Sequence, residues 1–167
     1  MGTNYYMMIK KKDIVEKYFP NEYELTDTPY FGYQVHIGKR SAGWRPLFKE
    51  HKNAYDSVKG MKKFIKKHQE NIRIFDEYAK EFTLEQLKEE LITWGEQQKI
   101  RYMKYIPEGV PDEIFGGKKY LVESTKDDYN ITIPFDHVAY AKLDNPWLNI
   151  KYWHDEDGYD FTDRPFS

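Results

Sequence analysis

Residues 30–51 read YFGYQVHIGKRSAGWRPLFKEH, and this stretch holds the clearest structural signal of the chain. Tyr33, Val35 and Ile37 alternate with polar or small residues, which is the two-residue period of a strand with one buried face. The pattern breaks at Lys39–Gly43 before an apolar segment resumes. We therefore expect a β-hairpin whose tip is cationic.

The tip of this hairpin combines small residues, which let a ligand approach the backbone closely, with positive charge. Lys39, Arg40 and Arg45 supply the cations. Ser41 adds a hydroxyl, and Trp44 is placed to stack on a base or ring. The tip predicts a concavity for an anion. The alternative is an ordinary turn with solvated Lys and Arg side chains.

A histidine lies on the polar side of the same strand. His36, close to Lys39 and Arg40, would suit a general base or a donor to phosphate, or it would simply satisfy a backbone group. The chain has five histidines and no cysteine, and no histidine pair has the spacing of metal ligands. We expect neither a metal site nor a cofactor.

Composition sets the class of protein. A length of 167 residues predicts one globular domain over residues 1–167. A charged share of 32% and an aromatic share of 17% exclude a disordered tail and a membrane protein. The net charge of −2 confines any attraction for polyanions to a local patch. Neither a signal-peptide pattern nor a membrane-spanning run is visible, so we expect a cytoplasmic protein.

Outside the hairpin, some segments show the two-residue period of a strand and others the spacing of an amphipathic helix. We expect strands at Tyr5–Ile9, Ile72–Phe75, Tyr120–Glu123, Tyr129–Ile133 and Trp147–Trp153, helices from Asp13, over Asn53–His68 and from Thr83, and loops at Leu25–Pro29 and Pro107–Gly117. Asp13 is expected to cap the first helix, and Thr83 with Gln86 forms a capping box for the last. This order predicts an α+β fold with a mainly antiparallel sheet and two or three amphipathic helices.

The helix expected over residues 53–68 has one basic side. Its lysines are Lys59, Lys62, Lys63, Lys66 and Lys67. Such a ridge either follows the phosphates of a nucleic acid or is only a solvated helix face.

Three motifs together resemble a family of small proteins common in phages and prophages. They are the MGTNYY start at residues 1–6, HIGKRSAGW at residues 36–44, and DGYDFTDRPFS at residues 157–167. The resemblance implies a phage-borne accessory gene that works in the cytoplasm of an infected bacterial host, and it brings no established activity. Between about residues 81 and 140 the chain resembles nothing in that family.

One departure from that family concerns metal. Many members carry a Cys-x-x-Cys-Gly-Arg segment before the HIGK motif that resembles a zinc site. This chain has Thr26-Asp27-Thr28-Pro29 in that neighbourhood and no cysteine. The departure weakens any mechanism that needs a metal.

The motifs at both ends and in the hairpin would meet if their strands were neighbours in one sheet. We therefore hypothesise a shared ligand site built from Asn4, Tyr6, His36, Lys39, Arg40, Ser41, Trp44, Arg45, Asp160 and Arg164. Cations, hydroxyls and aromatic rings around one pocket suit a phosphate-bearing, nucleotide-like molecule. The alternative is a polar network that only defines the fold.

The leading interpretation is a non-catalytic counter-defence protein that occupies a host defence protein or a nucleotide-like ligand. It rests on the absence of a readable nucleophile–base pair, carboxylate dyad or metal set. The first alternative is an enzyme acting on a phosphorylated or nucleotide substrate, with His36 as acid/base and Lys39 and Arg40 neutralising charge. The second is nucleic-acid binding through the lysines of residues 59–67. No membrane partner is expected.

Overall fold

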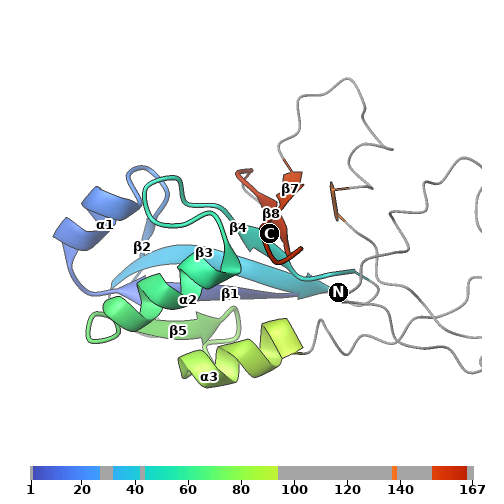
Figure 1. Cartoon of the computed structure of the whole chain (residues 1–167). Helices are drawn as coiled ribbons and strands as arrows, with labels where there is room; N and C mark the ends of the chain where they lie inside the picture. Colours follow the sequence, from blue (N-terminus) through green and yellow to red (C-terminus); the bar gives the residue numbers. More distant parts are fainter. Residues whose placement is uncertain (1, 27–31, 42–43, 94–136, 139–151, 165–167) are drawn as a thin grey trace, which may run out of the picture.

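The computed structural model describes residues 2–26, 32–41, 44–93, 137–138 and 152–164 (Figure 1). In chain order the elements are β1 (Gly2–Ile9), α1 (Lys12–Tyr18), β2 (Glu24–Thr26), β3 (Gly32–Ser41), β4 (Leu47–Lys49), α2 (Val58–Lys67), β5 (Ile72–Asp76), β6 (Glu81–Phe82), α3 (Leu84–Leu87), β7 (Tyr152–His154) and β8 (Asp160–Thr162). A π-helical segment, Lys88–Thr93, continues α3. None of these helices combines the length and the apolar character that crossing a bilayer would require.

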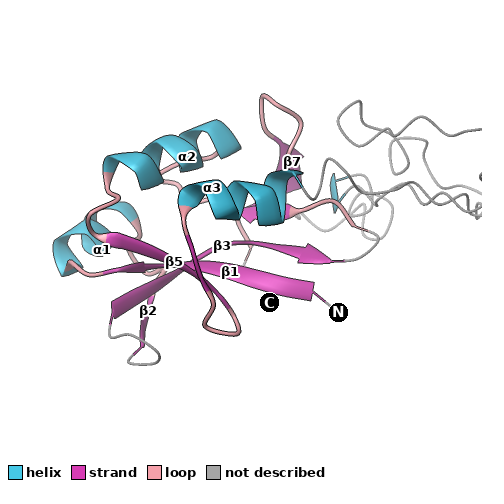
Figure 2. Ribbon diagram, turned by 90° about the horizontal axis from the view of Figure 1, so that it is seen from below, coloured by secondary structure: helices cyan, strands magenta, loops and turns pink. Residues whose placement is uncertain are grey.

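The strands form one sheet in the order β6-β5-β1-β3-β4-β8-β7, and β2 pairs with β3 beside this path. All neighbours run antiparallel except β4 and β8, which run parallel. The three helices cover one face of the sheet, and no described helix lies over the other (Figure 2). The predicted α+β fold with a mainly antiparallel sheet is confirmed. We call the second face the open face.

The core lies between the sheet and the helices. Alternate residues of the two central strands point into it and are fully buried, including Met7 and Ile9 of β1 and Val35 of β3. Their partners come from all three helices, for example Phe64 of α2. Burying a side chain of this size contributes about 1.5–3 kcal/mol, so this layer carries most of the hydrophobic stabilisation.

A bulge in the β1–β3 ladder explains part of the HIGK motif. Pairing passes from Tyr5–Gly38 to Tyr6–His36, which leaves Ile37 as the additional residue. Gly38 then lies against β4, where a Cβ atom would come within 2.5 Å of the Leu47 carbonyl oxygen. Only glycine lets β3 and β4 approach this closely.

The β1–β3 ladder shows that the prediction of a turn at Lys39–Ser41 is wrong. Residues 39–41 belong to β3 and pair with residues 2–4 of β1, so they are strand and not turn. The chain reverses after Ser41, whose carbonyl accepts a hydrogen bond of 3.0 Å from the Trp44 backbone N–H. The backbone N–H groups around Lys39 and Arg40 therefore belong to a sheet and do not form an anion-binding turn.

Helix ends agree in part with the sequence. The Thr83–Gln86 capping box is confirmed, with both reciprocal hydrogen bonds present. The helix expected from residue 53 starts later, because Ser57 caps α2 through the Gly60 N–H. Asp13 is not the cap of α1; the cap position is Lys11, without a side-chain bond, and Asp13 lies in the first turn.

Two strand boundaries also differ. The loop expected at residues 25–29 begins with the last residues of β2, which pair with β3. Of the strand expected at residues 147–153, the structure describes Tyr152 and Trp153 in β7. The strands expected at 120–123 and 129–133 and the loop expected at 107–117 lie outside the described residues.

Candidate functional site

Four residues from four strands form one row across the sheet. Asn4 pairs with Lys39, Lys39 pairs with Leu47, and Leu47 pairs with Asp160. Directly paired residues point to the same face of a sheet, and Tyr6 and His36, which also pair, lie on that face. The fold therefore places the start of the chain directly beside β3 and its last described strand, β8, on the other side of β4, within the same sheet.

Asp160 is the centre of a buried polar cluster at one end of this row. It is fully buried, and its Oδ1 lies 3.6 Å from Arg45 Nη1 and 3.3 Å from His154 Nε2. Its Oδ2 accepts a hydrogen bond of 2.9 Å from the His137 backbone N–H. Arg45 is itself only 3% exposed. A charge pair buried this deeply braces the structure and offers no charge to a ligand.

Arg40 lies on the opposite face of the sheet. It pairs with Thr3, one position from the row, and its guanidinium donates to the Glu90 carbonyl at 2.8 Å. The same Nη1 lies 3.3 Å from Glu90 Oε2. Arg40 therefore ties β3 to the π-helical segment and is separated by the sheet from His36.

Three further predicted site residues lie around the edges. Trp44 stacks on His137 with ring centroids 4.8 Å apart. Ser41 pairs with Gly2 at the end of β3. Arg164 is exposed beyond β8, and its backbone N–H donates to Thr162 Oγ1.

Lys39 remains in the row, and burial lowers its pKa below the ordinary value.

These placements divide the predicted cations among different environments. Arg45 joins the Asp160 cluster, Arg40 joins the helical layer, and Arg164 lies at the surface. Asn4, Tyr6, His36, Lys39 and Asp160 share the open face. The three predicted arginines therefore do not converge on one point of the described structure.

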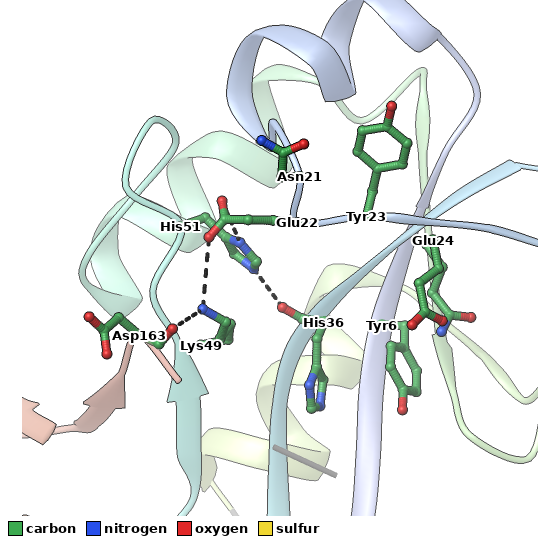
Figure 3. Close-up of a pocket in the computed structure, with 10 residues that line it drawn as sticks. Tyr6, Asn21, Glu22, Tyr23, Glu24, His36, Lys49, His51 and Asp163 are labelled. Carbon is green, nitrogen blue, oxygen red and sulfur yellow. Dashed lines mark hydrogen bonds and ion pairs between the residues drawn. The ribbon is translucent and has the colours of Figure 1, made fainter. Parts of the chain in front are cut away.

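The open face carries a cleft of about 550 Å³ beside His36 (Figure 3). We call it the open-face cleft; its lining residues are Tyr6, Asn21, Glu22, Tyr23, Glu24, Gln34, His36, Lys49, His51 and Asp163. They come from β1, β2, β3, β4, the segment between α1 and β2, and the residues after β4 and β8. Among these lining residues three are carboxylic acids and one is a lysine, so the cleft is acidic.

A hydrogen-bonded chain forms one wall of the cleft. His51, only 1% exposed, places Nε2 at 2.7 Å from the His36 carbonyl oxygen and Nδ1 at 3.4 Å from Glu22 Oε2. A carbonyl oxygen only accepts hydrogen bonds, so the contact with His36 places a proton on Nε2, and Nδ1 faces the Glu22 carboxylate. Burial would raise the pKa of Glu22, but His51 and Lys49 outweigh it and lower that pKa.

Lys49 also belongs to this wall, and its ammonium group contacts protein oxygens. Its Nζ donates to the carbonyl oxygens of Asp163 at 2.6 Å and Glu50 at 3.1 Å, and it lies 3.8 Å from Glu22 Oε1. Figure 3 shows the Glu22, Lys49 and His51 side chains converging on one end of the cleft. Lys49 and Glu22 therefore offset each other's charge, and the remaining carboxylic acids of the lining are Glu24 and Asp163.

Aromatic rings form the floor. The rings of Tyr6 and His36 are stacked, with centroids 4.9 Å apart and an interplanar angle of 25°. Burial lowers the pKa of His36 to about 4, and the charges of His51, Lys39 and Lys49 act in the same direction. Burial also raises the pKa of Tyr6. Both rings are therefore neutral near pH 7.

A second hollow of about 430 Å³ adjoins the open-face cleft. Both share Tyr6 and Gln34, and the second hollow is also lined by Met8, Phe75, Asp76, Glu77 and Ala79. Its two charged lining residues are again carboxylic acids. The two hollows together extend an aromatic and acidic surface across β3, β1 and β5.

The cleft does not contain a recognisable catalytic set. Both ring nitrogens of His51 face protein groups, so it acts as a brace and not as a base toward a ligand. In the described ranges no group of three or more His, Cys, Asp or Glu side chains could hold a metal ion. What the cleft offers is ring stacking, the Gln34 amide and carboxylates.

Sequence reasoning missed the acidic side of the site. Glu22 and His51 are 29 positions apart and belong to no spacing motif, so only the fold brings them together. Lys49 and His51 did carry a weak signal, because they alternate at the end of the quoted hairpin stretch. Glu24 and Gln34 are cross-strand partners, and the expected loop at 25–29 concealed that pairing.

Comparison with known proteins gives no further guide to the site. No protein-family description, no curated protein and no solved structure matches this chain.

Proposed function

We propose that this protein is a non-catalytic binding protein that acts by occupying a partner, and that the open-face cleft receives a cationic side chain of a partner protein. The observation that carries this proposal is the charge of the cleft. Three of its lining residues are carboxylic acids beside an aromatic floor, and its one lysine is paired with one of these acids, Glu22.

The charge of the cleft favours a protein partner over a phosphate-bearing ligand. A phosphate would bring negative charge beside Glu22 and Glu24, and the repulsion would be strong in a half-enclosed site. A guanidinium or ammonium group would instead pair with these acids and stack on the Tyr6 ring. Of the two ligand classes considered from the sequence, the host protein is the better supported.

The enzyme alternative has less support. A general acid or base works best when its pKa is close to the working pH. The pKa of His36, lowered to about 4 by burial, lies well below that range. The cations assigned to this mechanism are also separated, since Arg40 reaches Glu90 on the other face.

The motif resemblance to phage proteins supports a setting for such binding. A phage accessory protein of the counter-defence kind needs only to cover a surface of a host defence protein, and occupancy requires no chemistry. We therefore propose a host protein as the partner, in the cytoplasm of the infected bacterium.

The test is an NMR titration of the ¹⁵N-labelled full chain with two probes, an acetylated Trp-Arg-Trp amide peptide and ATP. The expected result is saturable shifts of the Glu24, Gln34 and Lys49 amides with the peptide and none with ATP. Shifts of these amides with ATP alone would contradict the acidic-cleft proposal, and new nucleotide masses after incubation would favour the enzyme.

A matched pair of variants separates the cleft from overall charge. Glu24→Gln removes a carboxylate of the cleft, whereas Glu70→Gln removes an exposed one between α2 and β5. We expect Glu24→Gln to weaken peptide binding about two- to fivefold, the scale of one exposed ion pair, and Glu70→Gln to leave it unchanged. Equal weakening by both variants would mean that the peptide responds only to net charge.

A further inference from the structure

One face of α2 carries the lysines noted in the sequence. We call Lys59, Lys62, Lys63, Lys66 and Lys67 the lysine ridge. At about 100° per residue they fall within an arc of about 140°. The buried residues Val58, Met61, Phe64 and Ile65 occupy the other side and fix α2 on the sheet. Packing therefore holds the ridge toward solvent in one orientation.

The ridge is not neutralised by the protein. α2 contains no acidic residue, and none of its five lysines forms an ion pair or hydrogen bond through its side chain with a described residue. Two described cations outside α2 show the contrast, because Arg73 is paired with Glu81 and Lys88 with Glu85. Like charges repel along such a face, and the helix dipole offsets this repulsion only for Lys66 and Lys67 in the last turn.

A second helix adds to the positive charge. Tyr18, at the end of α1, packs against Phe64 and His68 at the end of α2. Burial lowers the pKa of His68, and Lys67 and Lys17 lower it further. Cations from both helices therefore reach the same place, which extends the basic surface from α2 toward α1.

We propose that the lysine ridge binds the phosphate backbone of double-stranded nucleic acid without reading its sequence. The ridge spans about 12 Å along the helix, a length over which a duplex presents about seven phosphates. Lysines at this density would neutralise several phosphates of the duplex, and the counterions bound to those phosphates would be released. The inference is independent of the open-face cleft, which lies on the other face of the sheet.

The surroundings of the ridge distinguish a duplex from other anionic partners. The large apolar side chains exposed among the described residues are Leu25 and Tyr78, and neither lies on α2. An interfacial membrane helix needs apolar side chains that enter the lipid. Binding of single strands relies on exposed aromatic rings that stack on bases. The ridge has neither, so it fits backbone phosphates alone.

The test is fluorescence anisotropy with a labelled 20-base-pair DNA duplex of random sequence and the full chain. With four or more phosphates neutralised, affinity should fall more than about 100-fold between 50 and 200 mM NaCl. Absence of binding at 50 mM NaCl, or affinity that ignores salt, would overturn the proposal. Tighter binding to vesicles containing 30% phosphatidylserine than to the duplex would also overturn it.

Two double variants of equal charge locate the surface. Lys63→Gln/Lys66→Gln alters the ridge, and Lys80→Gln/Lys88→Gln removes two lysines outside it. We expect the first to weaken duplex binding about tenfold and to lower the salt slope by about two, and the second to stay within twofold of the wild type. Equal weakening by both would assign the binding to net charge and overturn the assignment to α2.

Discussion

The lysine ridge and the Asp160 cluster are both rich in charge, and they use it in opposite ways. On α2 the lysines stay at the surface without partners among the residues that the structure describes. Around Asp160 an arginine and a carboxylate meet where both are almost completely buried. In the sequence, Arg45 looked as available to a ligand as Lys63. The difference shows that the position of a charge in the sheet, and not its presence in a motif, decides whether it can meet a partner.

The largest expected effect comes from breaking the buried pair. Arg45→Met leaves the Asp160 carboxylate buried without its cation, and we expect a loss of about 3–5 kcal/mol in the free energy of unfolding. Urea denaturation measures it. The control is Arg73→Met, which breaks the exposed pair with Glu81 and should cost less than about 1 kcal/mol. Similar losses for both variants would contradict the contrast between buried and exposed charge.

A smaller effect is expected on stability at acidic pH. The folded-state pKa of His36 lies at about 4, below its unfolded value near 6.5, mainly because of burial. The unfolded chain therefore binds the proton first, and stability falls as the pH drops from about 6.5 to 4. The contribution of His36 is at most about 3 kcal/mol. His36→Phe keeps a ring beside Tyr6 and cannot titrate.

Denaturation curves of the wild type and His36→Phe between pH 7 and pH 4 test this expectation. The variant should show a shallower loss of stability on the acid side. His68→Phe serves as the comparison, because the pKa of His68 is lowered too but its ring is less enclosed. If His36→Phe follows the wild-type slope, His36 is not the group that takes up the proton on unfolding.

The smallest effect is expected on the lysine ridge. Lys59→Gln/Lys63→Gln removes repulsion on α2 outside its last turn, where the helix dipole favours Lys66 and Lys67, and should raise the free energy of unfolding by about 0.5 kcal/mol at low salt. Lys and Gln have similar helix propensities, so propensity does not obscure the result. The gain should vanish in 1 M NaCl, where exposed charges are screened. Destabilisation by this variant would show that the lysines hold partners within the protein.

Local signals in the sequence were sufficient for much of the fold. Alternation in β3, the heptad-like spacing of α2 and the capping box at Thr83 each depend on neighbours a few residues away, and each is present in the structure. The α+β class follows from their order. The cationic tip was wrong because pairing with β1 extends β3 through Ser41, and no local pattern reveals the length of a ladder.

The candidate site was predictable only in part, for the same reason. The sequence suggested that the chain start, the hairpin and the chain end would meet, and the Asn4–Lys39–Leu47–Asp160 row brings them into one sheet. The acidic wall was not predictable, because Glu22 and His51 meet only through the packing of a loop against β3.

The amino-acid sequence by itself determined the elements and the lysine ridge, since a helix places residues three and four apart on one face whatever surrounds it. Tertiary structure decided which charged side chains are paired inside the protein and which face the solvent. A strand has two faces, and a single bulge or one added pair determines on which of them a side chain lies. That choice placed Arg40 among the helices and His36 in the cleft.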